Sequence, residues 1–267
     1  MTKKNIFKIS IPSRWKLAVK TLPFVVVIIL WKSLVHYLWY EFLAMNALFT
    51  AIISANIFLI WFLISGVLSD YKESEKIPWD LASSIATMAD EGLIIIKNKN
   101  SMEAKNYLIH LREFNQSLID WFYKKERTEN LMKQLTAFND YFLIFENQTQ
   151  ANFIVRLKQE QNQIRKIINR VHTIRETSFL GTGYAIAEII TFILTVGMIF
   201  IKLEPFYESV FFVSFVSFIL IYMIFFIKDL DNPFGYSQED SLVEDVSLKP
   251  IIDNHKRMEE YCNNIIN

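Results

Sequence analysis

The longest uncharged run of the chain extends from Phe42 to Leu68 and contains no Lys, Arg, Asp or Glu. A bilayer core of ~30 Å is crossed by ~20 helical residues, so this run is long enough to span a membrane. Because it is longer than one crossing needs, we expect its helix to tilt, to break or to continue into the cytosol. Burial as a core helix of a soluble domain is the disfavoured alternative.

Three further apolar stretches are long enough to cross a bilayer. They run from about 22 to 40, from 183 to 201 and from 206 to 227. Lys32 and His36 interrupt the first, and Glu188 lies within the second. A buried core helix is a stronger alternative for the stretches at about 22–40 and 183–201 than for the stretch at 206–227. We therefore predict an all-α membrane protein with four transmembrane helices and a helical section between the second and third.

The composition excludes several other classes of protein. Hydrophobic residues make up 52% of the 267 residues and charged residues 21%, which suits neither a soluble domain nor a chain lying wholly in a membrane. Six glycines and six prolines are too few for the turns of a many-stranded barrel or sandwich. Lys plus Arg equals Asp plus Glu at 28 each, so no basic field favours nucleic acid as a partner. The single cysteine, Cys262, cannot form an intrachain disulfide or a zinc site.

The orientation follows from basic residues beside the crossings. Six of them precede the first crossing, at Lys3, Lys4, Lys8, Arg14, Lys16 and Lys20, whereas the loop between the last two crossings has only Lys202. Basic flanks stay in the cytosol, so we predict that both termini are cytosolic. The chain then divides into residues 1–69 (the N-terminus and crossings one and two), 70–182 (cytosolic helices), 183–228 (crossings three and four) and 229–267 (cytosolic tail).

The cytosolic section has the apolar spacing of helices. Pro78 suits the first turn of a new helix that continues to about Lys97, and Ser101 suits the start of the next. Further helices are expected over about 126–145 and from about 150, and Gly181 and Gly183 are expected to break the last one. This last helix is basic, and its charged face is either solvated, which we favour, or directed at anionic lipid.

No catalytic pattern stands out. The sequence has no glycine-rich phosphate loop, no His-Glu-x-x-His and no cysteine pair, and its four histidines are scattered. We therefore predict no enzyme activity, no cofactor and no metal. Lys32, His36 and Glu188 are ionisable groups inside the predicted membrane segments. They could line a hydrated path or pair with one another, or they could snorkel or form interhelical hydrogen bonds without transport, and both interpretations stay open.

Two motifs and their positions resemble those of a known family. Asn232, Pro233, Phe234 and Gly235 directly follow the fourth crossing, and Pro78 and Trp79 follow the second within an acidic-x-x-Pro-Trp stretch. With the weaker match at 14–16, these features resemble the bestrophin family, in particular its bacterial branch. Asn232 and Pro233 also suit a helix stop, and Gly235 suits a tight reversal. The resemblance implies that this turn folds the tail back onto neighbouring subunits.

The resemblance implies a passive ion channel in a bacterial inner membrane. Copies of the chain, expected as a homopentamer, would surround a central pore lined by the second crossing. The family's narrow neck has three large apolar residues four positions apart, and counting back from Pro78 and Trp79 places them at Ile53, Ile57 and Trp61. A small shift would instead bring in Phe58 and Phe62, which suits the family's preference for Phe. Stacked apolar rings can gate by dewetting.

The expected partners are therefore other copies of the chain, the lipid bilayer and permeant inorganic ions. We expect chloride, although the family includes cation-conducting members and the predicted neck carries no charge. Animal bestrophins hold calcium with a contiguous acidic run after the Asn-Pro-Phe-Gly motif. Here Glu239, Asp240, Glu244 and Asp245 are separated, so we do not extend calcium binding to this chain.

Two other functions stay open. In one, the crossings are only an anchor, and the cytosolic helices of an interaction or regulatory protein bind a partner. In the other, Lys32, His36 and Glu188 form the relay of a secondary transporter. Four crossings without an inverted repeat argue against the transporter.

Overall fold

The computed structural model describes residues 15–176, 181–234 and 245–266. Contacts between residues divide this part of the chain into two compact units. The first unit contains residues 15–71 and 181–232, and the second contains 72–176, 233–234 and 245–266. The four sequence segments predicted above are drawn from topology rather than contacts, and they stay a prediction.

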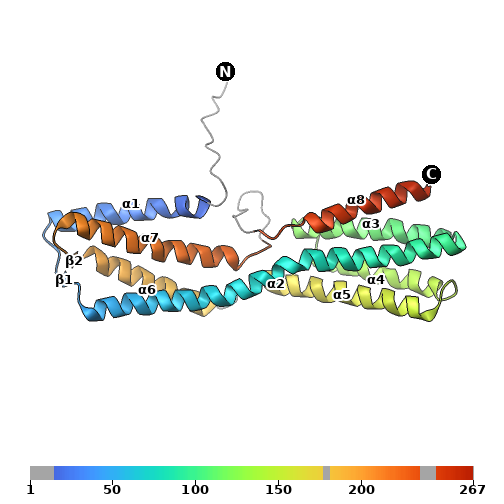
Figure 1. The fold of residues 1–267 in the computed structure, drawn as a ribbon, viewed down its shortest axis with the longest axis horizontal. Helices are drawn as coiled ribbons and strands as arrows, with labels where there is room; N and C mark the ends of the chain where they lie inside the picture. The colour runs from blue at the N-terminus through green and yellow to red at the C-terminus, as the bar shows by residue number, and fades with distance from the viewer. Residues whose placement is uncertain (1–14, 177–180, 235–244, 267) are drawn as a thin grey trace, which may run out of the picture. The chain divides into compact units, whose positions relative to one another are not determined.

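Four apolar helices form the first unit (Figure 1). They are α1 (Lys16–Tyr37), the N-terminal part of α2 (Ala47–Lys99), α6 (Gly181–Ile199) and α7 (Phe206–Leu230). Each belongs to a helical stretch that is long and apolar enough to cross a membrane. The four predicted crossings are thus confirmed as helices of spanning length and composition.

The core of the first unit is mainly aliphatic. On α2 its residues lie three or four positions apart, at Ile60, Leu63, Ile64 and Val67, which places them on one face of the helix. They pack with Ile28 of α1, with Ala187 and Met198 of α6, and with Val213, Leu220, Ile224, Ile227 and Leu230 of α7. The opposite face of α2 stays exposed within this chain.

A short strand pair closes one end of the first unit. β1 (Leu43–Ala44) follows α1, and β2 (Ile201–Lys202) follows α6; the two run parallel, with Leu43 opposite Ile201. Sequence patterns did not predict these strands, because two-residue strands carry no period. Trp39, Tyr40 and Tyr207 lie in or beside the loops at this end and are exposed.

The helix α2 is continuous through Pro78, so the prediction of a new helix beginning there is wrong. A proline inside a helix has no N–H group to donate to the carbonyl four residues before it. The helix nevertheless continues because an apolar stripe on the same face is buried on both sides of the proline, at Ile77, Leu81 and Ile85. The helix of the long uncharged run was expected to tilt, to break or to continue beyond the membrane span. In the structure it continues beyond the span.

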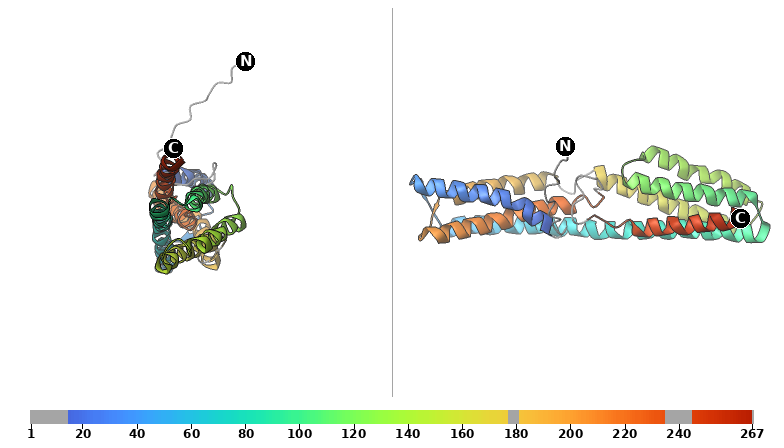
Figure 2. Two further views of the ribbon diagram at one scale, coloured as in Figure 1. Left: turned by 90° about the vertical axis from the view of Figure 1, so that its right-hand side faces the viewer. Right: turned by 90° about the horizontal axis from the view of Figure 1, so that it is seen from above.

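The second unit is a bundle of amphipathic helices that run alongside one another in both figures (Figures 1 and 2). It contains the C-terminal part of α2, α3 (Met102–Phe122), α4 (Thr128–Phe145), α5 (Ala151–Glu176) and α8 (Lys249–Ile266). Ser101 caps α3 by accepting a hydrogen bond from the Ala104 amide at 3.2 Å, as the sequence predicts. Gly181 and Gly183 were expected to break the helix, but both lie in the first turn of α6, so this prediction is wrong at these residues; residues 177–180 lie outside the described residues.

Aromatic side chains dominate the core of the second unit. Tyr107 is fully buried, its ring contacts Phe138, Phe142 and Phe145, and its hydroxyl donates to the Met88 carbonyl at 3.1 Å. The C-terminal helix α8 packs on α3 of the same chain, where the Asn115 amide donates to the Ile251 carbonyl at 3.3 Å. A contact of the tail with a neighbouring subunit stays a prediction.

Candidate functional site

The exposed face of α2 in the first unit carries large apolar side chains. Phe58 is 71% exposed, and Trp61 and Phe62 are 62% and 61% exposed. Of the three predicted neck residues, Trp61 and Ile57 are therefore exposed, Ile57 less so at 38%, whereas Ile53 is half-buried and packs against the core. The assignment of these residues to a neck stays a prediction.

Hydroxyl side chains lie on the same face of α2 before and after the aromatic ones. Ser54 precedes Phe58 by four residues, and Ser65 and Ser69 follow Phe62 by three and seven, so all share one side of the helix. All three serines are exposed, and Ser54 donates to the Thr50 carbonyl at 3.0 Å. This face of α2 is thus apolar in its middle and carries small polar side chains on the helical turns before and after it.

Lys32 is fully buried at the strand-pair end of the first unit. Its ammonium lies 2.6 Å from the Oε1 atom of Glu41, in the loop after α1, and it also donates to the Ile201 carbonyl in β2. A buried charge is tolerated only when it is paired and hydrogen-bonded, and these two partners meet that need. Lys32 thereby connects α1, the α1–α2 loop and β2.

His36 shares the carboxylate of Glu41. Its Nδ1 atom lies 3.0 Å from Oε2, and its ring stacks on Phe206 with the ring centroids 4.0 Å apart. Although burial raises the pKa of the Glu41 carboxyl, the hydrogen bonds and positive charges of Lys32 and His36 outweigh it, so the pKa lies below its ordinary value. Sequence analysis missed Glu41; the signal was an acidic residue shortly after two basic residues on one face of the preceding helix.

Glu188 has a different partner. Its carboxylate lies 2.7 Å from the ammonium of Lys228 on α7, and both side chains are about half exposed. Nearby, the Tyr184 hydroxyl donates to Asp231 at 2.9 Å. Lys32 and His36 therefore pair with Glu41, and Glu188 pairs with Lys228. The three predicted residues do not meet, as a relay would require.

The motif residues lie at two places. Pro78 is buried within α2, and Trp79 beside it is 68% exposed. After α7, Asn232 is exposed and the Pro233 carbonyl accepts a hydrogen bond from the Val246 amide at 3.1 Å. Phe234 is fully buried, with its ring 5.6 Å from that of Phe122. Gly235 lies outside the described residues.

Arg175 meets the same end of α3 that receives Phe234. Its guanidinium lies 4.5 Å from the Trp121 ring centroid and donates to the carbonyls of Trp121 and Phe122 at 3.3 and 2.9 Å. A cation at a helix C-terminus satisfies carbonyls that have no partner within the helix. Sequence analysis assigned Arg175 to a solvated basic face, so this role was missed.

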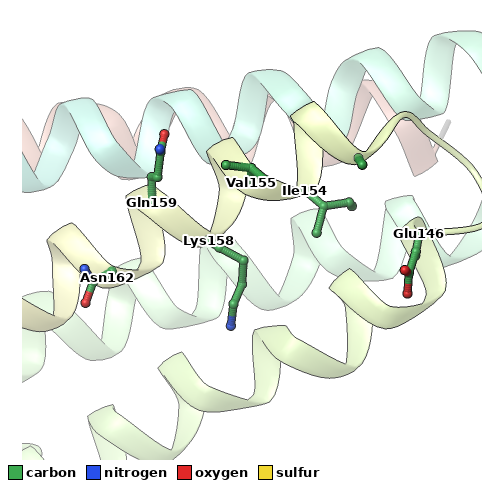
Figure 3. Close-up of a pocket in the computed structure, with 7 residues that line it drawn as sticks. Glu146, Ile154, Val155, Lys158, Gln159 and Asn162 are labelled. Atoms are coloured by element: carbon green, nitrogen blue, oxygen red, sulfur yellow. The ribbon is translucent and has the colours of Figure 1, made fainter.

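Lys158 lines a shallow groove of about 400 Å³ on α5 (Figure 3). Its ammonium donates hydrogen bonds to the side-chain amide oxygens of Asn139 at 2.7 Å and Gln161 at 2.9 Å. Glu146 lies at the edge of this groove, across from Ile154. In the part of the chain that the structure describes, no group of three His, Cys, Asp or Glu residues is placed to hold a metal ion.

Comparison with solved structures identifies the fold. No protein-family model matches the sequence, and no curated protein matches it. A crystal structure of a bacterial bestrophin homologue from Klebsiella pneumoniae superimposes with a TM-score of 0.76 over 90% of this chain and 97% of that chain, at 13% identity. The chain has the bestrophin fold. A point mutant of that homologue matches with a TM-score of 0.76 over 91% and 99% of the two chains at 14% identity.

A further match is a crystal structure described only as a membrane protein, with a TM-score of 0.77 over 91% of this chain and 98% of that chain at 13% identity. The resemblance inferred from the motifs is thus confirmed at the level of the fold. With four helices of spanning length and composition, the bestrophin-like chain is a membrane protein.

Proposed function

We propose that this bestrophin-like protein is a passive ion channel built from several copies of the chain, with α2 lining a central pore. The observation that carries the proposal is the exposed, apolar face of α2, in a fold shared with bestrophin homologues. A single four-helix unit is too small to enclose a water path. A closed ring of identical subunits creates one on its symmetry axis.

The mixed character of this α2 face favours a pore over a lipid contact. A helix face directed at lipid gains nothing from the hydroxyls of Ser54, Ser65 and Ser69, whereas a pore uses them to hydrate ions before and after a narrow apolar ring. We propose Ile53, Ile57 and Trp61 as the neck. The exposure of Phe58 and Phe62 supports the shifted alternative.

The proposal extends to the subunit number, the location and the ion selectivity of the channel. We expect five subunits, an inner membrane location with both termini cytosolic, and conduction of anions, with chloride as the first ion to test. The proposed neck is uncharged, so charges outside it would set the selectivity. No chemical step is needed for passive conduction.

The test is a recording of the purified full-length protein in a planar bilayer under a salt gradient. Discrete current steps are expected, and the sign of the reversal potential distinguishes anions from cations. Silence from protein that is demonstrably inserted and folded would contradict the channel. It would favour instead a membrane-anchored interaction protein, for which the exposed Trp79, Leu143 and Val155 of the second unit would be the first side chains to substitute.

The neck assignment has its own prediction. Trp61→Ala removes a large exposed ring from α2, so we expect conductance or open probability to rise, because a wider apolar ring dewets less readily. The matched control is Leu30→Ala, which removes an exposed apolar side chain (64% exposed) from α1. If Trp61→Ala behaves as this control does while Phe58→Ala or Phe62→Ala raises the current, the shifted assignment replaces the first.

A further inference from the structure

An apolar groove of about 940 Å³ opens on the first unit between α1, α6 and α7. Its walls include Phe24, Val27 and Trp31 of α1 and Phe192, Val196 and Ile199 of α6. Most of these side chains are exposed within the chain although they are large and apolar. The volume lies at the upper end of the ~300–1,000 Å³ that small-molecule sites occupy.

The length of the groove suits a hydrocarbon chain. Its α6 wall extends from Glu188 to Ile199, which corresponds to about 16 Å at ~1.5 Å per helical residue. One leaflet contributes about half of the ~30 Å hydrocarbon thickness of a bilayer. The groove can therefore hold one acyl chain along most of its length, in a unit whose helices have the length and composition of membrane spans.

Among the described residues that line the groove, the charged ones lie together at one end. Lys228 and Glu188 pair there, and the Lys20 ammonium lies 5.1 Å from the ring of Phe225, which lines the groove. Lys228 already neutralises the Glu188 carboxylate, whereas the Lys20 ammonium has no carboxylate partner among the described residues, so Lys20 is available to an anionic group. The Lys228 side chain is half exposed, and Lys20 is exposed, so both can reach a headgroup beside the helices.

We propose that this groove binds an anionic glycerophospholipid, with an acyl chain between α1, α6 and α7 and the phosphate near Lys20 and Lys228. An apolar wall alone would suit a neighbouring copy of the chain equally well. The Lys20 ammonium at one end of an acyl-length groove favours the lipid, because a phosphate complements its charge. The proposal concerns a face formed by α1, α6 and α7, and it does not depend on conduction along α2.

Two adjacent valines provide a matched test. Val27 lines the groove and Val26 does not, yet the two are 51% and 53% exposed on the same helix. Val27→Trp fills the groove, whereas Val26→Trp adds the same bulk outside it. Lys20→Gln removes a charge at the groove end, and Lys202→Gln removes an exposed charge beside the strand pair.

The measurement is native mass spectrometry of the full-length protein in detergent, with phosphatidylglycerol and phosphatidylcholine of identical acyl chains as probes. The wild type is expected to bind phosphatidylglycerol more tightly. Val27→Trp is expected to weaken both lipids about tenfold, by excluding several methylene groups from the groove, while Val26→Trp leaves both unchanged. Lys20→Gln is expected to reduce the preference for phosphatidylglycerol about fivefold, with Lys202→Gln as the unaffected control.

Three outcomes would overturn the proposal. Equal binding of the two lipids to the wild type would show that the protein does not recognise the anionic headgroup. Unchanged lipid binding by Val27→Trp would place the acyl chain elsewhere. A change in subunit number in Val27→Trp, without a change in lipid binding, would assign the groove to a neighbouring copy. Val196→Trp, on the opposite wall, provides a second groove variant should Val27→Trp fail to fold.

Discussion

The two units of this protein bury a charged side chain in different ways. In the first unit, Lys32 is fully buried, and only 9% of the side chain of its partner Glu41 is exposed. In the second unit, Glu91 is almost as deeply buried, but its partner Arg156 approaches from solvent with 58% of its side chain exposed. Loss of Glu91 would leave Arg156 in water, whereas loss of either member of the first pair leaves the other charge buried. The comparison indicates that the first pair contributes to folding mainly by avoiding an isolated buried charge.

The hydrophobic cores of the two units also differ. The first unit packs branched aliphatic side chains from four helices, whereas the second surrounds Tyr107 with other aromatic rings and holds its hydroxyl on the Met88 carbonyl. Interlocked rings leave less freedom for repacking than aliphatic chains do. The second unit should therefore be the less tolerant of added volume.

The largest effect is expected when the fully buried pair is broken. Among the described residues, Glu41→Ala leaves the Lys32 ammonium with the Ile201 carbonyl as its partner, and an uncompensated buried charge costs about 3–5 kcal/mol. Thermal unfolding in detergent measures the loss. The control is Glu188→Gln, which breaks the half-exposed pair with Lys228 and should cost at most about 1 kcal/mol. Equal losses of stability in the two variants would refute the contrast between a fully buried and a half-exposed ion pair.

A smaller effect tests the difference between the cores. A methyl group at Gly92 would lie 2.9 Å from carbon atoms of the Tyr107 ring, which cannot move because it is fully buried. Overpacking costs about 1–3 kcal/mol, and the helix propensity of alanine offsets about 1 kcal/mol of this, so Gly92→Ala should lower the free energy of unfolding by up to about 2 kcal/mol.

Gly197→Ala is the matched variant in the first unit. Its methyl group would meet the edge of the half-buried Phe49 ring at 3.1 Å, and that ring has room to shift. We expect unchanged or slightly raised stability, read from the same thermal unfolding experiment. A loss as large as that of Gly92→Ala would show that the first unit is packed as rigidly as the second.

The smallest effect is a dependence on acid pH. The pKa of Glu41 is lowered in the folded protein, so its carboxylate contributes stability above its unfolded pKa, and this contribution is lost as the pH falls through the lower folded value. Melting temperatures of wild type and Glu41→Gln should therefore differ most at neutral pH and converge below the ordinary carboxyl pKa of ~4.3. A difference that stays constant down to strongly acid pH would contradict the proposed ionised state of Glu41.

Particular residues show how far sequence patterns reach. Hydropathy predicts the four crossings because each needs only a continuous apolar run, and the cap at Ser101 predicts the start of α3 because capping is local. Pro78 was misplaced as a helix start because a local rule does not include the packing of Ile77 and Leu81 around it. Arg175 was missed because its partners on α3 are more than 50 residues away in the chain, and Glu41 was missed because the loop that returns it to Lys32 and His36 has no periodic pattern.

The amino-acid sequence by itself determines that this chain is a helical membrane protein, and its motifs at 78–79 and 232–235 indicate the bestrophin fold. Those properties depend on local hydropathy, spacing and turn chemistry. The tertiary structure alone decides which ionisable groups pair, which face of α2 is left exposed, and that α1, α6 and α7 leave an acyl-sized groove. The physical reason is that burial and pairing depend on the distance between side chains far apart in the chain, which no local pattern encodes.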